Sequence, residues 1–455
     1  MNEPAPPSER RGRAAAAFVA VAAWLAFGAF SLLPYRPPAA VSGISPRLLA
    51  ADVAALAEAP RPTATAAAAE ARRYLVRRLR AGGLAPQLQE IPGRTGEAAG
   101  SGAVNVLARL PGTGDGAALL FSAHYDSVPG SPGAADDAAA VAALLQVASR
   151  LAAAPPRRND LIFLFSDGEE EGLTGARAFA GLHPWAEDVR LVANFDALGS
   201  RGPSLLFRTA GAAAPALAAL ATGPRPAGSS LGEEMFRHLG HRTDLDALAA
   251  LRAPAPPVPA LDFALVLGSS TYHRPGDVPA ALDLRSALHH ASHALVLATA
   301  LGDAELPPVG GPEPPPAARR VYFNLPPGLL IHYPATRALL LASGILLGVV
   351  LLAGALVRRG RARPGRMLAD ALRVPVDALA GAGLLAVVHG AIFSGGGGPA
   401  GEPWQGLYLG SLGLVAVAAV VVLHAGDSAR QAPGDGALAG PALAWGLAAG
   451  AAAAT

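Results

Sequence analysis

The sequence contains neither cysteine nor lysine, and the two absences exclude several classes of enzyme. Without cysteine there is no thiol nucleophile, no thiolate zinc site and no disulfide bond. Without lysine there is no Schiff-base chemistry, no serine-lysine dyad and no phosphate-binding loop of the Walker type. Any metal must therefore be held by histidine and carboxylate side chains.

Charge is also scarce in this chain. Only 15% of its 455 residues are charged, whereas 52% are hydrophobic. This composition is too apolar for one ordinary soluble domain, so we expect part of the chain to contact a lipid bilayer. The 36 basic residues nearly balance the 34 acidic ones, and this balance gives no reason to expect a nucleic-acid partner.

The N-terminal segment has the pattern of a membrane anchor. Residues 1–13 form a polar tail with three arginines, and residues 14–34 form an apolar run that is long enough to span a bilayer. The arginines predict a cytoplasmic tail and an exported domain after the span. A cleaved signal peptide is the alternative, although its apolar part normally has only about 7 to 15 residues.

The C-terminal part predicts further membrane spans. Residues 304–334 are rich in proline and glycine and suit a linker, and residues 335–455 suit a multispan membrane region. Its apolar runs are 335–357, 374–393, 406–425 and 437–454. Five arginines follow the first run, and the positive-inside rule makes this cluster cytoplasmic. Both charge signals therefore place the intervening domain on the non-cytoplasmic side, which in a bacterium is the periplasmic or extracellular face of the inner membrane.

Residues 45–303 predict a separate α/β domain. Short apolar runs, among them 117–123, 161–165, 191–195 and 262–267, alternate with longer helical stretches. This alternation predicts a mostly parallel mixed sheet that is flanked by helices.

Side chains that can bind a metal or transfer a proton follow these predicted strands. In chain order they are His124 and Asp126, Asp136 and Asp137, Glu169, Glu170 and Glu171, Asp196, and Tyr272 and His273. The carboxyl ends of parallel strands meet at one edge of a sheet, so we expect these residues to converge. Imidazoles, a shared carboxylate and a free carboxylate are what a two-metal hydrolase needs.

These blocks, in this order, resemble the zinc aminopeptidase family, the M28 peptidases. Within it the chain looks most similar to the endoplasmic-reticulum metallopeptidases and the vacuolar membrane proteases, which carry the domain between an N-terminal span and a C-terminal multispan region. The stretches 241–244 and 260–264 are similar to theirs.

The resemblance implies two zinc ions per chain and a role for each residue. His124 and Asp196 would bind one ion, Glu170 and His273 would bind the other, and Asp136 would bridge them. Glu169 would be the general base, Asp126 would orient His124, and the peptide bond between Asp136 and Asp137 would be cis. The run of three glutamates leaves one alternative open, because a shift of one residue would exchange base and ligand.

The activity that the resemblance implies is hydrolysis of peptide bonds by an exopeptidase, most simply an aminopeptidase that releases N-terminal residues from peptides. Two other functions remain open. One is a zinc acyltransferase of the glutaminyl-cyclase kind, which uses the same fold with fewer metals. The other is a non-catalytic receptor or scaffold, a class that typically loses ligands.

Other chemistry-bearing residues have simpler interpretations. His289, His290 and His293 share a helix but have no nearby carboxylates, so we expect an ordinary core or surface role. His389 and His424 lie in or beside predicted spans, where we expect a structural role. Residues 228–232 spell a serine-hydrolase elbow, but the prolines before it disfavour the strand that such an elbow requires.

Overall fold

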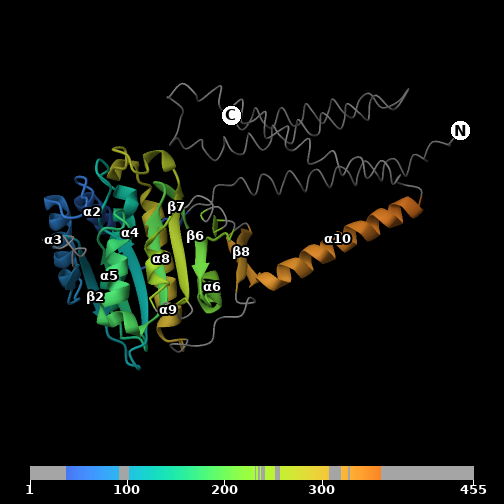
Figure 1. Cartoon of the computed structure of the whole chain (residues 1–455), viewed down its shortest axis with the longest axis horizontal. Helices are drawn as coiled ribbons and strands as arrows, with labels where there is room; N and C mark the ends of the chain where they lie inside the picture. The colour runs from blue at the N-terminus through green and yellow to red at the C-terminus, as the bar shows by residue number, and fades with distance from the viewer. Residues whose placement is uncertain are drawn as a thin grey trace, which may run out of the picture. The chain divides into compact units, whose positions relative to one another are not determined.

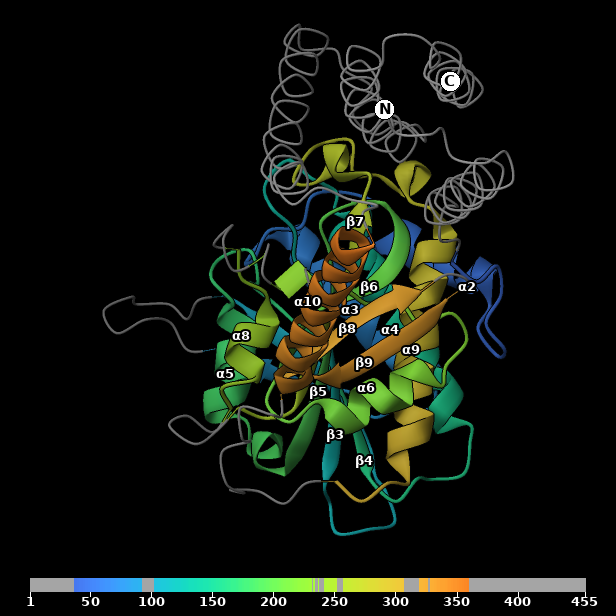
Figure 2. The same ribbon diagram turned by 90° about the vertical axis from the view of Figure 1, so that its right-hand side faces the viewer.

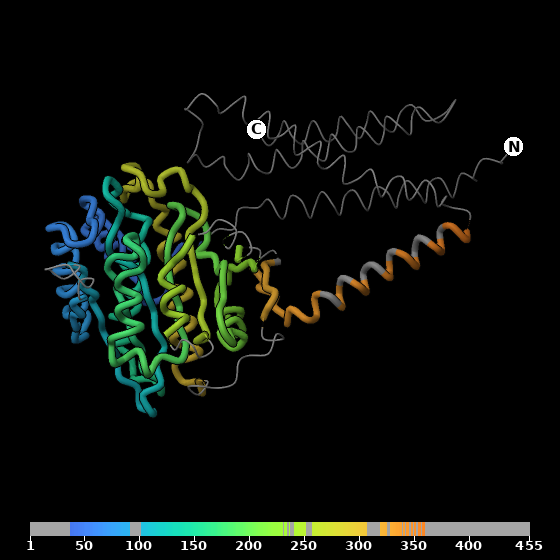
Figure 3. The backbone as a smooth tube through the Cα atoms, viewed as in Figure 1, coloured from blue at the N-terminus to red at the C-terminus, as the bar shows by residue number. Residues whose placement is uncertain are grey.

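The computed structural model describes residues 37–91, 102–230, 232–233, 236, 241–251, 257–306, 319–325 and 328–359. The chain forms two compact units, Tyr35–Ser343 and a second made of Met1–Pro34 with Gly344–Thr455. The first, which we call the central unit, contains every candidate site residue. Figure 3 traces its backbone from α2 and α3 through the sheet to β8.

A seven-stranded sheet lies at the middle of the central unit (Figure 1). Its strands are β1 (Gln87–Glu90), β2 (Val104–Leu110), β3 (Ala118–His124), β4 (Asp160–Ser166), β5 (Val189–Ala197), β6 (Arg201–Ala210) and β7 (Ala260–Leu267), in the spatial order β1-β2-β4-β3-β5-β7-β6. The four inner strands are parallel, and the outer strands pair antiparallel. The predicted mixed sheet is therefore confirmed, although only its four inner strands are parallel and half of its six pairings are antiparallel.

Both faces of the sheet are buried. Successive side chains of a strand point to opposite faces, so Phe121, Phe163 and Phe195 enter one hydrophobic core while Leu120 and Val192 enter another. Because neither face meets water, the middle of β3 and of β4 carries apolar residues on both faces rather than at alternate positions. This explains why the sequence shows them as short continuous hydrophobic runs.

Helices cover the two faces as separate layers (Figures 1 and 2). The larger core packs against α2 (Pro46–Leu56), α3 (Ala66–Ala81), α4 (Ala139–Ala152), α6 (Ala214–Ala221) and α9 (Leu284–Gly302). The smaller core packs against α5 (Thr174–Leu182) and α8 (Asp244–Leu248). Side-chain caps fix where several of these helices begin: Ser45, Thr65 and Asp283 each accept a hydrogen bond from a backbone N–H of the first turn.

A two-stranded hairpin follows α9 in the chain. It comprises β8 (Arg320–Leu325) and β9 (Leu329–Pro334) and lies within the range that the sequence predicts as a linker. Asn324 donates to Pro226 O at 2.7 Å, and Ser230 N donates to Tyr322 O at 2.8 Å. The hairpin is therefore folded onto the loop that holds the supposed serine-hydrolase elbow, so Ser230 has a structural partner there.

Helix α10 (Ala335–Arg358) begins directly after β9. Among the residues that the structure describes, no helix has both the length and the apolarity needed to cross a membrane. The span predicted for residues 335–357 is thus not found. The other predicted spans and His389 and His424 lie outside the described residues.

Candidate metal centre

The predicted site residues meet at the carboxyl edge of the four parallel strands. His124 is the last residue of β3, and Glu169 and Glu170 lie on the loop that follows β4. Asp196 is near the end of β5, and His273 follows β7 after one short turn. Parallel strands bring these distant blocks to one edge.

Asp136 lies between two imidazoles. Its Oδ1 is 3.1 Å from Nε2 of His124, and its Oδ2 is 3.3 Å from Nε2 of His273. Asp196 Oδ1 lies 3.7 Å from the same nitrogen of His124, and Glu170 Oε2 lies 3.1 Å from that of His273. The five residues therefore form two groups of three donors that share one carboxylate.

The loop that carries Asp136 has an unusual backbone. Gly133 has φ 64°, and a Cβ atom there would lie 2.3 Å from the carbonyl oxygen of Asp136, so only glycine fits. The peptide bond between Asp136 and Asp137 is cis, as the resemblance implies. The buried carboxylate of Asp137 accepts a hydrogen bond from His124 N at 3.3 Å.

Two residues that the sequence analysis missed hold this loop. Asp277 accepts hydrogen bonds from the backbone N–H groups of Ala135 (2.8 Å) and Asp136 (3.1 Å). The buried guanidinium of Arg61 donates to the carbonyl oxygens of Tyr125, Pro132 and Gly133. Asp277 could have been suspected, because it follows His273 closely in a Pro-Gly loop. Nothing in the sequence around Arg61 signals its role.

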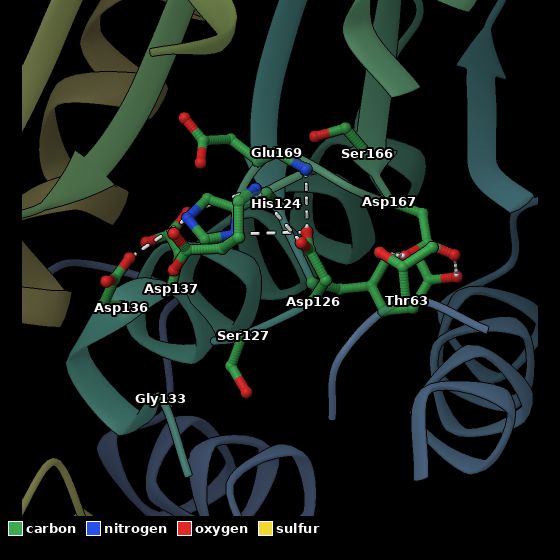
Figure 4. A network of polar contacts seen from close by, with 12 residues as sticks. Thr63, His124, Asp126, Ser127, Gly133, Asp136, Asp137, Ser166, Asp167 and Glu169 are labelled. Atoms are coloured by element: carbon green, nitrogen blue, oxygen red, sulfur yellow. Dashed lines mark hydrogen bonds and ion pairs between the residues drawn. The ribbon is translucent and has the colours of Figure 1, made fainter. Parts of the chain in front are cut away.

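Asp126 joins the histidine to the glutamate loop (Figure 4). Its Oδ1 lies 3.4 Å from Nδ1 of His124, the position predicted for a residue that orients this imidazole. The same carboxylate accepts hydrogen bonds from the backbone N–H groups of Glu169 (3.2 Å) and Glu170 (3.3 Å). The second contact was not predicted. Through these contacts Asp126 supports His124 in one group of candidate metal ligands and Glu170 in the other.

A buried ladder of polar side chains crosses the sheet beneath the centre. Ser122 donates to Asn194, and Asn194 donates to Asp262, which also accepts hydrogen bonds from Arg208 and Thr243. Ser122 and Asn194 each precede a site residue by two positions, so they lie on the same face of their strands. We call this set the polar ladder. Thr243 also caps α8, so the ladder connects four strands to the helix beside the cavity.

Mutual charge interactions shift the pKa values of the site residues. Burial lowers the pKa of His124, but the close carboxylates of Asp126, Asp136 and Asp196 outweigh burial and raise this pKa well above its usual value. Hydrogen bonds to Asp136 and Glu170 raise the pKa of His273 to about 10. Burial raises the pKa of Glu169 well above the ordinary range for a glutamate. The acids and imidazoles of the centre therefore lie close enough together to change one another's pKa values.

The donor set fits a divalent cation. His124, Asp136 and Glu170 each offer one ligand atom, and these atoms lie within 4.8 Å of one another. Oε1 of Glu170 is buried with no hydrogen-bond partner among the described residues. No described arginine forms an ion pair with the four carboxylates that line the cavity, and the imidazoles of His124 and His273 are their close basic partners. Nitrogen and carboxylate donors in this arrangement suit zinc.

A cavity of about 240 Å³ opens beside the centre. Asp136, Glu169, Glu170, Asp196 and His273 line one part of it. Another part of its lining is apolar and comes from Leu198, Phe207, Phe236 and Ala264, which pack together as a small cluster. Glu169 has no hydrogen bond or ion pair through its carboxylate within the described part of the chain. A substrate in this cavity would therefore meet a free carboxylate and an apolar surface together.

The three histidines of α9 are part of the core. All three are buried, and Oγ of Ser204 lies 2.9 Å from Nδ1 of His290 and 3.2 Å from Nδ1 of His293. The rings of His290 and His293 contact Phe195 and Phe263, respectively. Burial lowers the pKa of His290 to about 3, so it is neutral at physiological pH. The prediction of an ordinary core role is confirmed.

Comparison with known proteins identifies the domain. The model of peptidase family M28 matches residues 105–298, which include every residue of the candidate centre. Residues 105–298 are a peptidase family M28 domain. The family is one of zinc-dependent peptidases, so zinc is the metal that it implies for this site.

The relatives of this M28 domain include a vacuolar membrane protease and an endoplasmic reticulum metallopeptidase. The vacuolar membrane protease of Eremothecium gossypii is 33% identical over 228 residues, which are 49% of this chain and 21% of that protein. Endoplasmic reticulum metallopeptidase 1 of Mus musculus is 28% identical over 272 residues, 59% of this chain and 30% of that protein. This chain thus matches only about a fifth to a third of the length of these relatives.

Solved structures include similar chains as well. The aminopeptidase from Aneurinibacillus sp. strain AM-1 aligns with 59% of this chain and 97% of its own, with 14% identity and a TM-score of 0.46.

Proposed function

We propose that the chain is a two-zinc aminopeptidase that removes N-terminal residues from peptides. The observation that carries the proposal is the position of Asp136, whose two oxygens face the imidazoles of His124 and His273. Asp196 would complete the first half-site and Glu170 the second. Asp126 would hold His124 in orientation through its second ring nitrogen.

Glu169 is the general base of this proposal. Zinc bound in the cavity would lower the pKa of a water molecule and polarise the scissile carbonyl. The carboxylate of Glu169 takes a proton from the attacking water and later gives it to the leaving amine. Its backbone N–H donates to Asp126, which keeps the carboxylate beside the half-sites, and the absence of a described side-chain partner leaves it available.

The apolar part of the cavity favours a hydrophobic residue at the N-terminus of the substrate. Phe207 and Phe236 are in ring contact at 4.9 Å between centroids, and Leu198 lies beside them. A leucine-sized side chain would bury its surface there, at a gain of about 25 cal/mol for each Å² removed from water.

Removal of zinc tests the proposed activity. We expect the full-length chain, purified in detergent, to release leucine from leucyl peptides and to lose at least about a hundredfold of this rate after dialysis against a chelator, because zinc supplies the Lewis acid. Added zinc should restore the rate, and chelator saturated with zinc beforehand should not lower it. Full activity in metal-free protein would contradict the proposal.

The same assay separates the alternative functions. A glutaminyl-cyclase-like acyltransferase would convert peptides with N-terminal glutamine into cyclised products without releasing an amino acid, which mass spectrometry detects. A receptor or scaffold would produce neither product. The M28 domain here keeps a donor at each position that the resemblance requires, which favours the peptidase.

We further propose that the domain is held at a membrane with its active site on the non-cytoplasmic side. The apolar run 14–34 with arginines before it, and the membrane proteins among its relatives, support this proposal. We expect the chain to stay in the membrane pellet after an alkaline carbonate wash, and protease added to spheroplasts should digest the M28 domain. Release of the intact chain by carbonate would contradict the anchor.

A further inference from the structure

Two arginines on the lining of the cavity have no ionic partner among the residues that the structure describes. Arg177 lies on α5, and Arg242 immediately precedes Thr243, the cap of α8. Both side chains are exposed, and neither takes part in an ion pair or a side-chain hydrogen bond among the described residues. Both line the cavity that contains Glu169 and the proposed zinc ligands.

The same two arginines line a second hollow, an open groove of about 550 Å³ that also borders α5 and α8. Asp246 is the one described acidic residue that lines this groove, and its carboxylate already accepts hydrogen bonds from other residues. It receives hydrogen bonds from Arg208 at 3.0 and 3.1 Å and from Thr243 N at 3.0 Å. The arginine pair therefore presents positive charge where the cavity and the groove meet, and neither guanidinium forms an ion pair with a described carboxylate.

The position of the pair determines which part of a substrate it meets. The cavity is small, so it has room for about one residue of a peptide between the apolar surface and the proposed zinc ligands. Each further residue adds at most about 3.6 Å of chain. The free C-terminus of a peptide of two or three residues therefore lies within a few ångströms of the cavity's rim.

We propose that Arg177 and Arg242 bind the C-terminal carboxylate of short peptides and make dipeptides and tripeptides with a free C-terminus the preferred substrates. This inference rests on the proposed peptidase function. The guanidinium group suits the role because its planar donors match a carboxylate with two parallel hydrogen bonds. A carboxylate is the anion that a peptide carries at this place, which favours it over phosphate.

The test compares leucyl-leucine with leucyl-leucinamide, which differ only in the charge of the C-terminus. With the zinc-loaded full-length chain we expect kcat/KM to be about tenfold higher for the free acid. The double variant Arg177→Gln/Arg242→Gln should bring this ratio close to one. Arg47→Gln is the matched control, because Arg47 is exposed on α2 and lines neither hollow, and it should keep the ratio of the wild type.

A binding measurement separates this inference from the proposed function. In the Glu169→Gln chain, calorimetry should show leucyl-leucine binding about tenfold more tightly than its amide, or about 1.4 kcal/mol. The two arginine substitutions should remove this difference. Cleavage and binding of acid and amide with equal efficiency would overturn the arginine assignment and leave the peptidase intact. Tighter binding of the acid, without cleavage of either peptide by the wild type, would instead refute the peptidase.

Discussion

Replacement of Glu169 by glutamine is expected to lower kcat for leucyl peptides about a thousandfold, because a glutamine cannot accept the proton of the attacking water. The zinc content should stay unchanged, since Glu169 belongs to neither proposed half-site. The hydrogen bond from its backbone N–H to Asp126 does not depend on the side chain, so the loop should keep its position. Steady-state kinetics and metal analysis of the same preparation measure both effects.

Glu171 provides the matched control for this substitution. It is the exposed third member of the same glutamate run and does not line the cavity. Glu171→Gln should retain the wild-type kcat and zinc content. If Glu171→Gln lost zinc while Glu169→Gln remained active, the register of the run would be shifted by one residue, and Glu170 would be the base.

Replacement of Asp136 by alanine is expected to reduce bound zinc from two ions per chain to fewer than one and to reduce activity below detection. Asp136 is the one residue whose two oxygens face both imidazoles, so its loss removes a donor from each half-site. Its removal also leaves two histidines beside the remaining acids without their shared partner. Elemental analysis after gel filtration in zinc-free buffer gives the metal content.

Two further variants show whether a loss of zinc reflects misfolding. Asp136→Asn keeps the size and the backbone hydrogen bond to Asp277 but lacks the charge, and it should also lose zinc. Asp303→Asn removes an exposed carboxylate that pairs with Arg157, and it should bind two zinc ions. Circular dichroism spectra that match the wild type would exclude unfolding. Retention of two ions by both Asp136 variants would contradict the bridging role.

The sequence predicts the centre of the sheet better than its margins. Helices cover both faces of the inner strands, so β3 and β4 carry mostly apolar residues and appear in the sequence near their true limits. The short edge strand β1 is largely exposed and has the composition of a loop, so no hydrophobic pattern marks it. The hairpin of β8 and β9 follows a Pro-rich stretch and owes its stability to contacts with residues about 100 positions earlier, which local composition cannot reveal.

The same contrast holds for the candidate centre. His124, Asp136 and Asp196 were predicted because each stands at the end of a recognisable strand or beside a glycine turn. The supporting residues Arg61 and Asp277 act through backbone groups of the Gly133 loop, and such contacts leave no side-chain pattern. The proposed metal ligands are thus visible in the sequence, whereas the residues that shape the backbone appear only in three dimensions.

The polar ladder has a consequence for protein engineering. Ser122, Asn194 and Asp262 connect neighbouring strands directly below the carboxyl edge, and Arg208 joins them to the cap of α8. A design that transfers the five proposed ligands to another α/β scaffold must therefore also transfer the polar ladder. If apolar residues replaced the ladder, the spacing of the strands would depend on the host scaffold alone. The proposed ligands must lie within about 0.5 Å of the productive geometry, and nothing would then hold them there.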